Sequence, residues 1–234
     1  MDVIRLRLLG GFACEASGSS VELPFGMQRL LAFLALRGPS HRCLVAGSLW
    51  PEVRESQALA SLRTGVWRVN AILPGALIAK RDALGMSGST QVDTQQQETF
   101  ATALLRDHLD DPEVISASLP TLLTGELLPG WYDDWVVFER ERQSQLRLHA
   151  LESTARLLTR HNQLDAALQL ALEAVRAEPL RETANAVLMS VYLAEGNVSD
   201  AIRQYTVFRE LLRRELGLEP SPKLAQLLPG SATF

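Results

Sequence analysis

The sequence predicts a mainly helical protein with a small β portion, divided into two domains. Short stretches in which apolar and polar residues alternate occur near the N-terminus, whereas the pattern is almost entirely helical from Glu98 onward. A chain of 234 residues is also long enough for two modest domains, each with its own core. We place these domains at residues 1–96 and 97–234.

The first domain begins with short strands. Residues 3–8, VIRLRL, alternate apolar and charged side chains, as a strand with one face in water does. Gly10-Gly11 supplies a bend before FACEA, and VELP follows the turn-forming residues SGSS. We therefore expect a small sheet.

Three helices and a β-hairpin are predicted next. The helices are Met27–Arg37, about Arg42–Trp50, and a third that begins near Ser56, a candidate N-cap, and ends before Pro74. ALIAKR, the turn RDALG and MSGSTQVD predict a hairpin of two strands. This order is typical of a winged helix in the OmpR-like arrangement, whose third helix enters the major groove of DNA.

The third helix has two faces. Its predicted core stripe consists of Leu59, Leu62, Val66, Val69 and Leu73. Its outward face consists of Ala60, Thr64, Trp67, Arg68 and Ala71, with Arg63 and Asn70 on its flank. Arginine can contact guanine edges or phosphates while small residues permit close approach, so Arg63, Thr64, Trp67 and Arg68 are candidate DNA-binding residues. An ordinary solvated face fits the helix pattern alone, but the order of the elements favours DNA binding. We expect Trp67 to be covered by a neighbouring segment or another subunit.

Three further basic residues are candidates for phosphate contacts. Lys80 and Arg81 lie at the predicted hairpin tip, where the alternative is a solubilising turn. Arg42, near the start of the second helix, could reach the DNA backbone from the other side or be plain surface. Residues 1–96 hold 10 Lys and Arg against 7 Asp and Glu, and the remainder holds 13 against 20, so phosphate contacts should fall to the first domain.

The second domain contains a repeat. Residues 162–166, NQLDA, align with residues 197–201, NVSDA, at an offset of 35, and each block joins two amphipathic helices. This spacing is near that of tetratricopeptide units, which stack into surfaces for protein contact. Ala166 and Ala201 are then equivalent helix-contact positions. Asp111-Pro112 predicts a further helix start.

Other functional classes are disfavoured. Cys14 and Cys43 form no CxxC pair, and His41 beside Cys43 falls short of the four ligands of a structural zinc site. The sequence contains no HExxH, GxSxG, GxxxxGK[ST] or dinucleotide-type glycine motif. We expect no catalytic residue, metal or cofactor. The start of the sequence resembles no export signal and its apolar runs are short, so a cytoplasmic location is expected.

Over almost its whole length the sequence resembles the SARP-type transcriptional activators of actinobacteria, in a small form without ATPase modules. These proteins join an OmpR-like winged helix to a bacterial transcriptional activator domain of tetratricopeptide-like helices. The resemblance rests on QRLLAFLAL, Leu49-Trp50, SLRTGVWRVNAIL, the run from Gly125 to Glu152 that contains GWYDDW, and ELGLEPSPKL. We expect Trp131, Tyr132 and Trp135 to pack between helices or domains. The third helix departs from many relatives because Val69-Asn70-Ala71-Ile72 carries no arginine.

The resemblance implies a pathway-specific activator of antibiotic or other secondary-metabolite genes. Such a protein binds direct repeats beside a promoter as a dimer on double-stranded DNA, recruits RNA polymerase, and is nucleoid-associated when bound. The loop PEVRESQ lies where OmpR-like domains can touch polymerase, which makes Glu52, Arg54 and Glu55 candidates, although a polar connection is equally consistent. The alternative function is a helical-repeat scaffold that has lost DNA binding.

Overall fold

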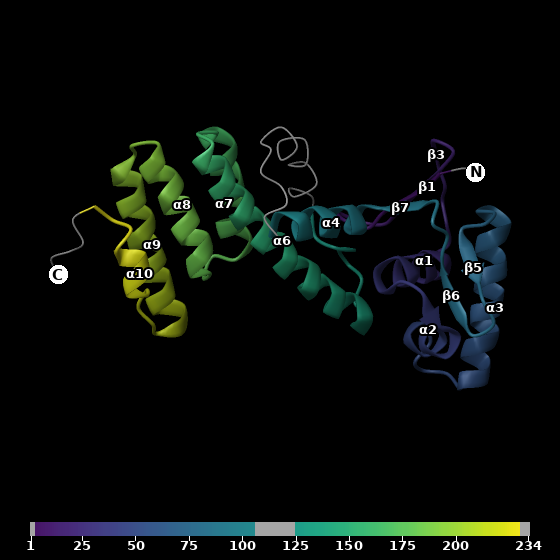
Figure 1. Cartoon of the computed structure of the whole chain (residues 1–234). Coiled ribbons are helices and arrows are strands. Elements are labelled where there is room, and N and C mark those ends of the chain that lie inside the picture. Colours follow the sequence, from purple (N-terminus) through teal and green to yellow (C-terminus); the bar gives the residue numbers. More distant parts are fainter. Residues whose placement is uncertain (1–2, 106–124, 230–234) are drawn as a thin grey trace. The chain divides into compact units, whose positions relative to one another are not determined.

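The computed structural model describes residues 3–105 and 125–229, which form two compact units (Figure 1). The first unit comprises residues 3–98 and 125–144, and the second comprises residues 99–105 and 145–229. The fold is mainly helical with small sheets in the first unit, which confirms the predicted fold class. The helix start predicted at Asp111-Pro112 lies outside the described residues.

The first unit contains a four-stranded sheet of order β3-β2-β1-β7. Its strands are β1 (Ile4–Arg7), β2 (Ala13–Ala16), β3 (Ser19–Ser20) and β7 (Thr90–Val92). β1 pairs antiparallel with β2 and parallel with β7. Ser17 and Gly18 both have positive φ, 52° and 80°, as a two-residue type I′ turn requires. The return strand therefore starts at Ser19, and the prediction of a strand at VELP is wrong.

The three helices follow in the predicted order and share the unit with a second sheet. The helices are α1 (Phe25–Arg37), α2 (Arg42–Leu49) and α3 (Glu55–Ile72). The second sheet has the order β4-β6-β5 and consists of β4 (Ser40–His41), β5 (Leu77–Ala79) and β6 (Ala83–Met86). α1 lies at the centre of the core, with Leu30, Leu31 and Leu34 fully buried.

The hairpin exists, but its second strand differs from the prediction. β6 returns along β5 with Leu77 opposite Met86, and Leu84 of β6 is fully buried. Gly85 packs against Pro39, where an added Cβ would lie 3.3 Å from the proline ring, so the close approach favours glycine. The residues 90–92 that were assigned to this hairpin instead join the other sheet as β7.

The start of α3 also corrects a detail of the sequence analysis. The helix begins at Glu55, and Arg54 occupies the N-cap position without a side-chain cap, so Ser56 is not the N-cap. A glutamate in the first turn is favourable beside the positive end of the helix dipole. Leu62, Val69 and Leu73 are buried as the core stripe predicted.

Residues 125–144 pack on the core of the first unit. Leu127 and Leu128 are buried, and the Leu128 N–H donates to the Leu8 carbonyl at 2.9 Å. Trp135 is 6% exposed and its ring meets Phe33 edge-on at 5.3 Å between centroids. The predicted packing role is confirmed for this tryptophan. Tyr132 is 84% exposed, so the same expectation is wrong for it within the described structure.

Polar contacts hold the same segment in place. The Arg140 guanidinium donates to the carbonyls of Leu127, Leu128 and Trp131 at 3.0, 2.8 and 2.9 Å. Arg29 of α1 forms an ion pair with Asp133. A segment that the sequence analysis placed in the second domain therefore contributes to the first core, and the domain boundary at residue 96 stays a prediction.

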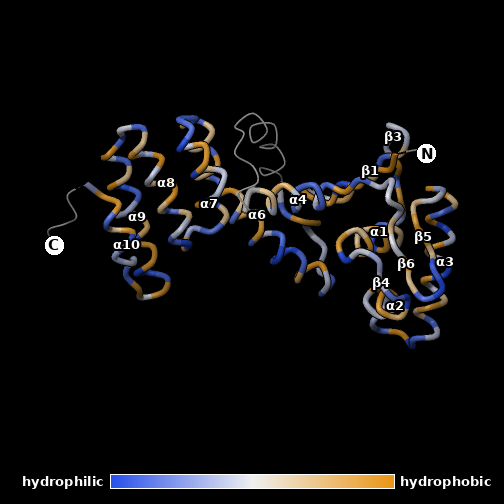
Figure 2. The backbone as a smooth tube through the Cα atoms, in the orientation of Figure 1, coloured by the Kyte–Doolittle hydropathy of each residue, from blue (hydrophilic) through white to orange (hydrophobic). Residues whose placement is uncertain are grey.

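The second unit is built from helices. They are the last part of α4 (Asp93–Leu105), most of α6 (Asp134–Arg160), α7 (Leu164–Ala177), α8 (Glu182–Ala194), α9 (Val198–Leu216) and the short α10 (Pro222–Ala225). Neighbouring helices in the chain pack side by side, and hydrophobic and hydrophilic stretches alternate along α7 to α9 (Figure 2). The core is lined by the apolar stripes of these helices.

The helix starts correct the register of the repeat by one residue. The N-cap positions of α7 and α9, Gln163 and Asn197, are 34 positions apart. At this offset the fully buried Ala167 corresponds to the fully buried Ala201, whereas Ala166 is half-buried. The equivalence of Ala166 with Ala201 is therefore wrong, because the similar loop residues were aligned in place of the helices that follow them.

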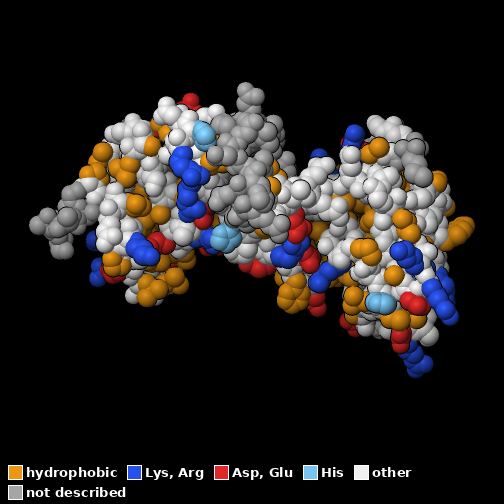
Figure 3. All heavy atoms as spheres, viewed as in Figure 1, with side chains coloured by type: hydrophobic (Ala, Val, Ile, Leu, Met, Phe, Trp, Pro, Cys, Tyr) orange, Lys and Arg blue, Asp and Glu red, His pale blue; other side chains and the backbone are white. Residues whose placement is uncertain are grey.

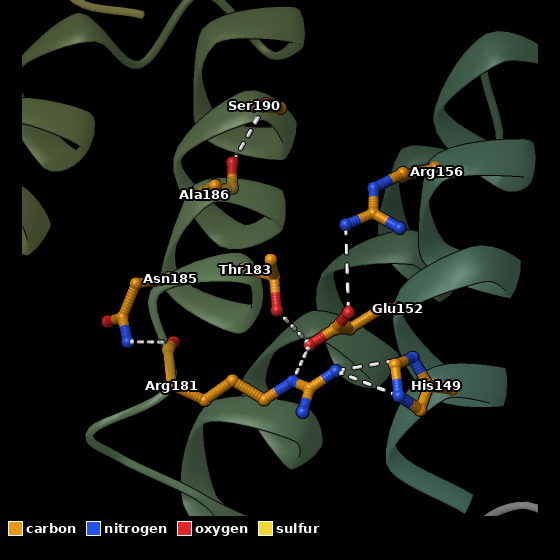
Figure 4. A network of polar contacts seen from close by, with 8 residues as sticks. All are labelled: His149, Glu152, Arg156, Arg181, Thr183, Asn185, Ala186 and Ser190. Carbon is orange, nitrogen blue, oxygen red and sulfur yellow. Dashed lines mark hydrogen bonds and ion pairs between the residues drawn. The ribbon is translucent and has the colours of Figure 1, made fainter. Parts of the chain in front are cut away.

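A buried carboxylate joins α6 to the start of α8 (Figure 4). Glu152 accepts hydrogen bonds from Arg181 Nε at 2.6 Å and from Thr183 Oγ1 at 2.8 Å. Arg156, one turn further along α6, lies 3.6 Å from its second oxygen. The Glu152 side chain is only 3% exposed, so these partners satisfy a charge that would otherwise be costly to bury.

Candidate nucleic-acid interface

The outward face of α3 is open in the first unit. Arg63, Thr64, Trp67 and Arg68 are all exposed, which agrees with the predicted orientation of the helix. Trp67 is 71% exposed, so the expectation that a neighbouring segment covers it is wrong for the described residues. The Thr64 hydroxyl donates to the Ala60 carbonyl at 3.2 Å, within the same helix.

Asn70 differs from the other residues of this face. It is half-buried, and its Oδ1 accepts the Leu77 N–H at 3.2 Å. This bond fixes the start of β5 to the last turns of α3, so Asn70 positions the hairpin and is not part of the outward surface. The sequence analysis missed this contact because it joins two elements through a turn.

The hairpin tip and the start of α2 lie together. The Lys80 N–H donates to the Ala83 carbonyl at 2.9 Å and closes the turn, which leaves Lys80 and Arg81 exposed. The Arg42 N–H donates to the carbonyl of Asp82 at 3.0 Å. The backbone of Arg42 is therefore beside the hairpin tip, and the contact of its side chain with the DNA backbone stays a prediction.

The loop between α2 and α3 contributes three more candidate residues. Glu52 and Arg54 are exposed, and Glu55 is the first residue of α3. A hydrogen bond with Glu55, some burial, and the negative charges of Glu55 and Asp82 raise the pKa of the exposed Cys43 thiol. Glu55 is thus engaged with α2, whereas Glu52 and Arg54 project from the loop.

A hollow of about 480 Å³ lies between the start of α2 and the middle of α3. It is lined by Leu59, Leu62, Val66 and Trp67, with Arg42 and Arg63 as its charged residues. The sequence analysis placed these side chains on different faces and so missed the hollow.

Positive side chains gather around this surface. Lys and Arg spheres lie along the part of the first unit that carries α2 and α3, with a few acidic spheres between them (Figure 3). The described residues contain no group of three His, Cys, Asp or Glu side chains placed to hold a metal ion. No helix among them is long and apolar enough to cross a bilayer. The arrangement is suited to contact with a polyanion through arginine and lysine.

Comparison with known proteins finds a domain family and two similar regulators. The bacterial transcriptional activator domain matches residues 116–228. The chain is 30% identical over 239 residues to the regulatory protein AfsR of Streptomyces coelicolor, and 29% identical over 244 residues to AfsR of Streptomyces griseus. These alignments cover 96% and 97% of this chain.

The chain is similar over nearly its whole length to SARP-family regulators, and residues 116–228 match their bacterial transcriptional activator domain. It spans about a quarter of the length of the AfsR relatives, 24% in each case. The structure of Mycobacterium tuberculosis EmbR in complex with a low-affinity phosphopeptide matches with a TM-score of 0.79 at 20% identity, over 97% of this chain and 64% of that one. This likeness supports the fold, a winged helix followed by the helical activator domain. Both AfsR relatives are described as regulatory proteins.

Proposed function

We propose that this chain is a SARP-family, sequence-specific transcriptional activator that inserts α3 into the major groove of promoter DNA. The observation that carries the proposal is the exposed face of α3, on which Arg63, Thr64, Trp67 and Arg68 stand free of the core. A fully formed pair between arginine and guanine discriminates against a wrong base by about 1–3 kcal/mol.

The hairpin supplies affinity without sequence information. Lys80 and Arg81 are exposed at the tip, and Arg42, whose backbone is bonded to Asp82 and whose side chain lines the hollow beside α3, is a third cation. Cations on a hairpin tip and at a helix start are suited to phosphates on either side of the groove that holds α3. The DNA-binding domain is proposed to comprise residues 1–96, with residues 125–144 completing its core.

The partners follow from the family. We infer binding to direct repeats as a homodimer on DNA, recruitment of RNA polymerase, and control of secondary-metabolite genes such as those for antibiotics. Glu52, Arg54 and Glu55 are all exposed, and Glu55 is the weaker polymerase candidate because its carboxylate accepts a hydrogen bond from the Cys43 thiol. The protein would act in the bacterial cytoplasm, on the nucleoid when bound.

The test is selection of binding sites from a pool of random duplexes with the full chain, followed by mobility shift. We expect one motif, recovered as a direct repeat. Arg63→Ala should lose the preference for that motif, while Arg176→Ala should retain it, because Arg176 is a highly exposed arginine of the second unit. A protein that leaves even concentrated duplex unshifted at low salt would instead be a scaffold, and the proposal would fail.

A further inference from the structure

The hollow beside Trp67 is apolar on a surface that is otherwise charged. Leu62 forms a fully buried wall, Leu59 and Val66 are half-buried, and the indole of Trp67 is 71% exposed. Exposed apolar surface of this kind is unfavourable in water, and covering it with an apolar group lowers the free energy. The hollow therefore needs an occupant that carries an apolar group.

The charges around the hollow restrict that occupant. Arg42 and Arg63 line it. Glu55 and Asp82 are the acidic residues near the start of α2, where they influence Cys43. Two arginines beside an apolar hollow favour a polyanion that also presents a small apolar group.

Duplex DNA meets both conditions through thymine. The C5-methyl group of thymine is the apolar group that base pairs present in the major groove, and small apolar side chains contact it in known recognition. Two polar side chains of the same helix are already engaged within the unit: Thr64 donates to Ala60, and Asn70 accepts from Leu77. Recognition at the hollow is therefore through apolar contact.

We propose that the hollow formed by Leu59, Val66 and Trp67 holds the methyl group of a thymine, so that α3 selects thymine at one position of its site. This inference rests on the proposed function, because it requires α3 to lie in the major groove. It assigns to Trp67 a role in specificity, whereas Arg42 and Arg63 supply attraction to the backbone or to a neighbouring guanine.

The experiment replaces each thymine of the selected duplex, one at a time, by deoxyuridine, which lacks only the methyl group. For the unmodified protein we expect deoxyuridine at one position per half-site to lower the affinity about fourfold, which is the effect of losing one buried carbon group. Deoxyuridine at the other positions should leave the affinity unchanged. With Trp67→Ala the difference between thymine and uracil at that position should vanish. Ile72→Ala is the matched control, because Ile72 is an exposed apolar residue of α3 outside the hollow, and it should keep the difference.

Each other outcome identifies which statement fails. If the protein binds its selected duplex but no deoxyuridine weakens it, the thymine contact is refuted and DNA binding stands. The thymine contact is also refuted if the difference between thymine and uracil persists in Trp67→Ala. It is refuted as well if Trp67→Ala changes only the oligomeric state of the protein, because a second copy of the chain would then be what covers the hollow. If Trp67→Ala binds too weakly to measure, Trp67→Leu should show a reduced but finite difference, and a full difference would refute the contact. No binding to any duplex would overturn the proposed function and this inference together.

Discussion

Trp135→Ala should destabilise the first unit and spare the second, although Trp135 lies on α6, a helix that contributes to both. The side chain is 6% exposed and packs against Phe33, with ring centroids 5.3 Å apart, and against Trp131 at 6.4 Å. Its indole nitrogen is buried and has no hydrogen-bond partner in the described structure, so the loss is one of packing. Truncation of a buried tryptophan to alanine costs about 3–5 kcal/mol.

That cost is large against the whole stability of a domain, which is about 5–15 kcal/mol. For a unit of this size it corresponds to a fall of at least about 10 °C in the midpoint of thermal unfolding. Hydrogen exchange measured by mass spectrometry localises the effect. Peptides from α1 should exchange faster in Trp135→Ala, and peptides from α8 and α9 should keep their protection.

Phe138→Ala is the matched control, because Phe138 follows one turn later on α6 and is 71% exposed. Its effect should stay within about 0.5 kcal/mol. The reasoning is refuted if the two variants lose the same stability, or if Trp135→Ala exposes α8 and α9 while α1 stays protected. Either result would mean that the GWYDDW segment does not belong to the first core.

Three further predictions concern other parts of the chain. Burial raises the pKa of Cys14 to about 11, so a thiol reagent at pH 8 should label Cys43 in the native protein and Cys14 only after unfolding, as mass spectrometry would detect; rapid labelling of both would contradict the burial. Ala167→Leu and Ala201→Leu should each cost about 1–3 kcal/mol in denaturant titrations, and the half-buried Ala166 should tolerate leucine better; equal effects at positions 166 and 167 would contradict the register. Glu152→Leu should lower the free energy of unfolding by about 2–3 kcal/mol in the same titrations. This is less than for a fully buried pair, because the Arg181 side chain keeps 22% exposure. An unchanged midpoint would show that the Glu152 network adds nothing to stability.

The order of elements could be predicted from the sequence because each element carries its own local signal. The 3.6-residue periodicity of α3 places Leu62, Val69 and Leu73 on the core side and leaves Arg63 and Trp67 outside, and the structure agrees. Turns were harder, because β-turn geometry decides where a strand resumes. Because Ser17 has a positive φ, the turn is tight and β3 begins at Ser19, two residues before the predicted strand VELP.

Contacts between distant segments could not be predicted at all. No local pattern in GWYDDW predicts that Trp135 contacts Phe33, which lies more than a hundred residues earlier in the chain. The hollow beside Trp67 likewise requires the packing of α2 on α3, which no single helix pattern contains. The bond from Arg42 to Asp82 joins a helix start to a hairpin tip through the second sheet. These are tertiary facts, and they shape the candidate interface more than any one motif does.

The central claim is that α3 selects sequence while the hairpin tip contacts phosphate, and one titration series tests it directly. Affinity is measured for the selected duplex and for random duplex at several salt concentrations, with Arg63→Ala and with the double variant Lys80→Ala, Arg81→Ala. Arg63→Ala should lose about 1–3 kcal/mol of discrimination between the two duplexes. The double variant should weaken both duplexes alike and flatten the plot of log affinity against log salt by about 0.9 for each lost phosphate contact. If the double variant changed specificity while Arg63→Ala changed only the salt slope, the assignment would be reversed, and if neither variant altered binding, the proposed orientation on DNA would be wrong.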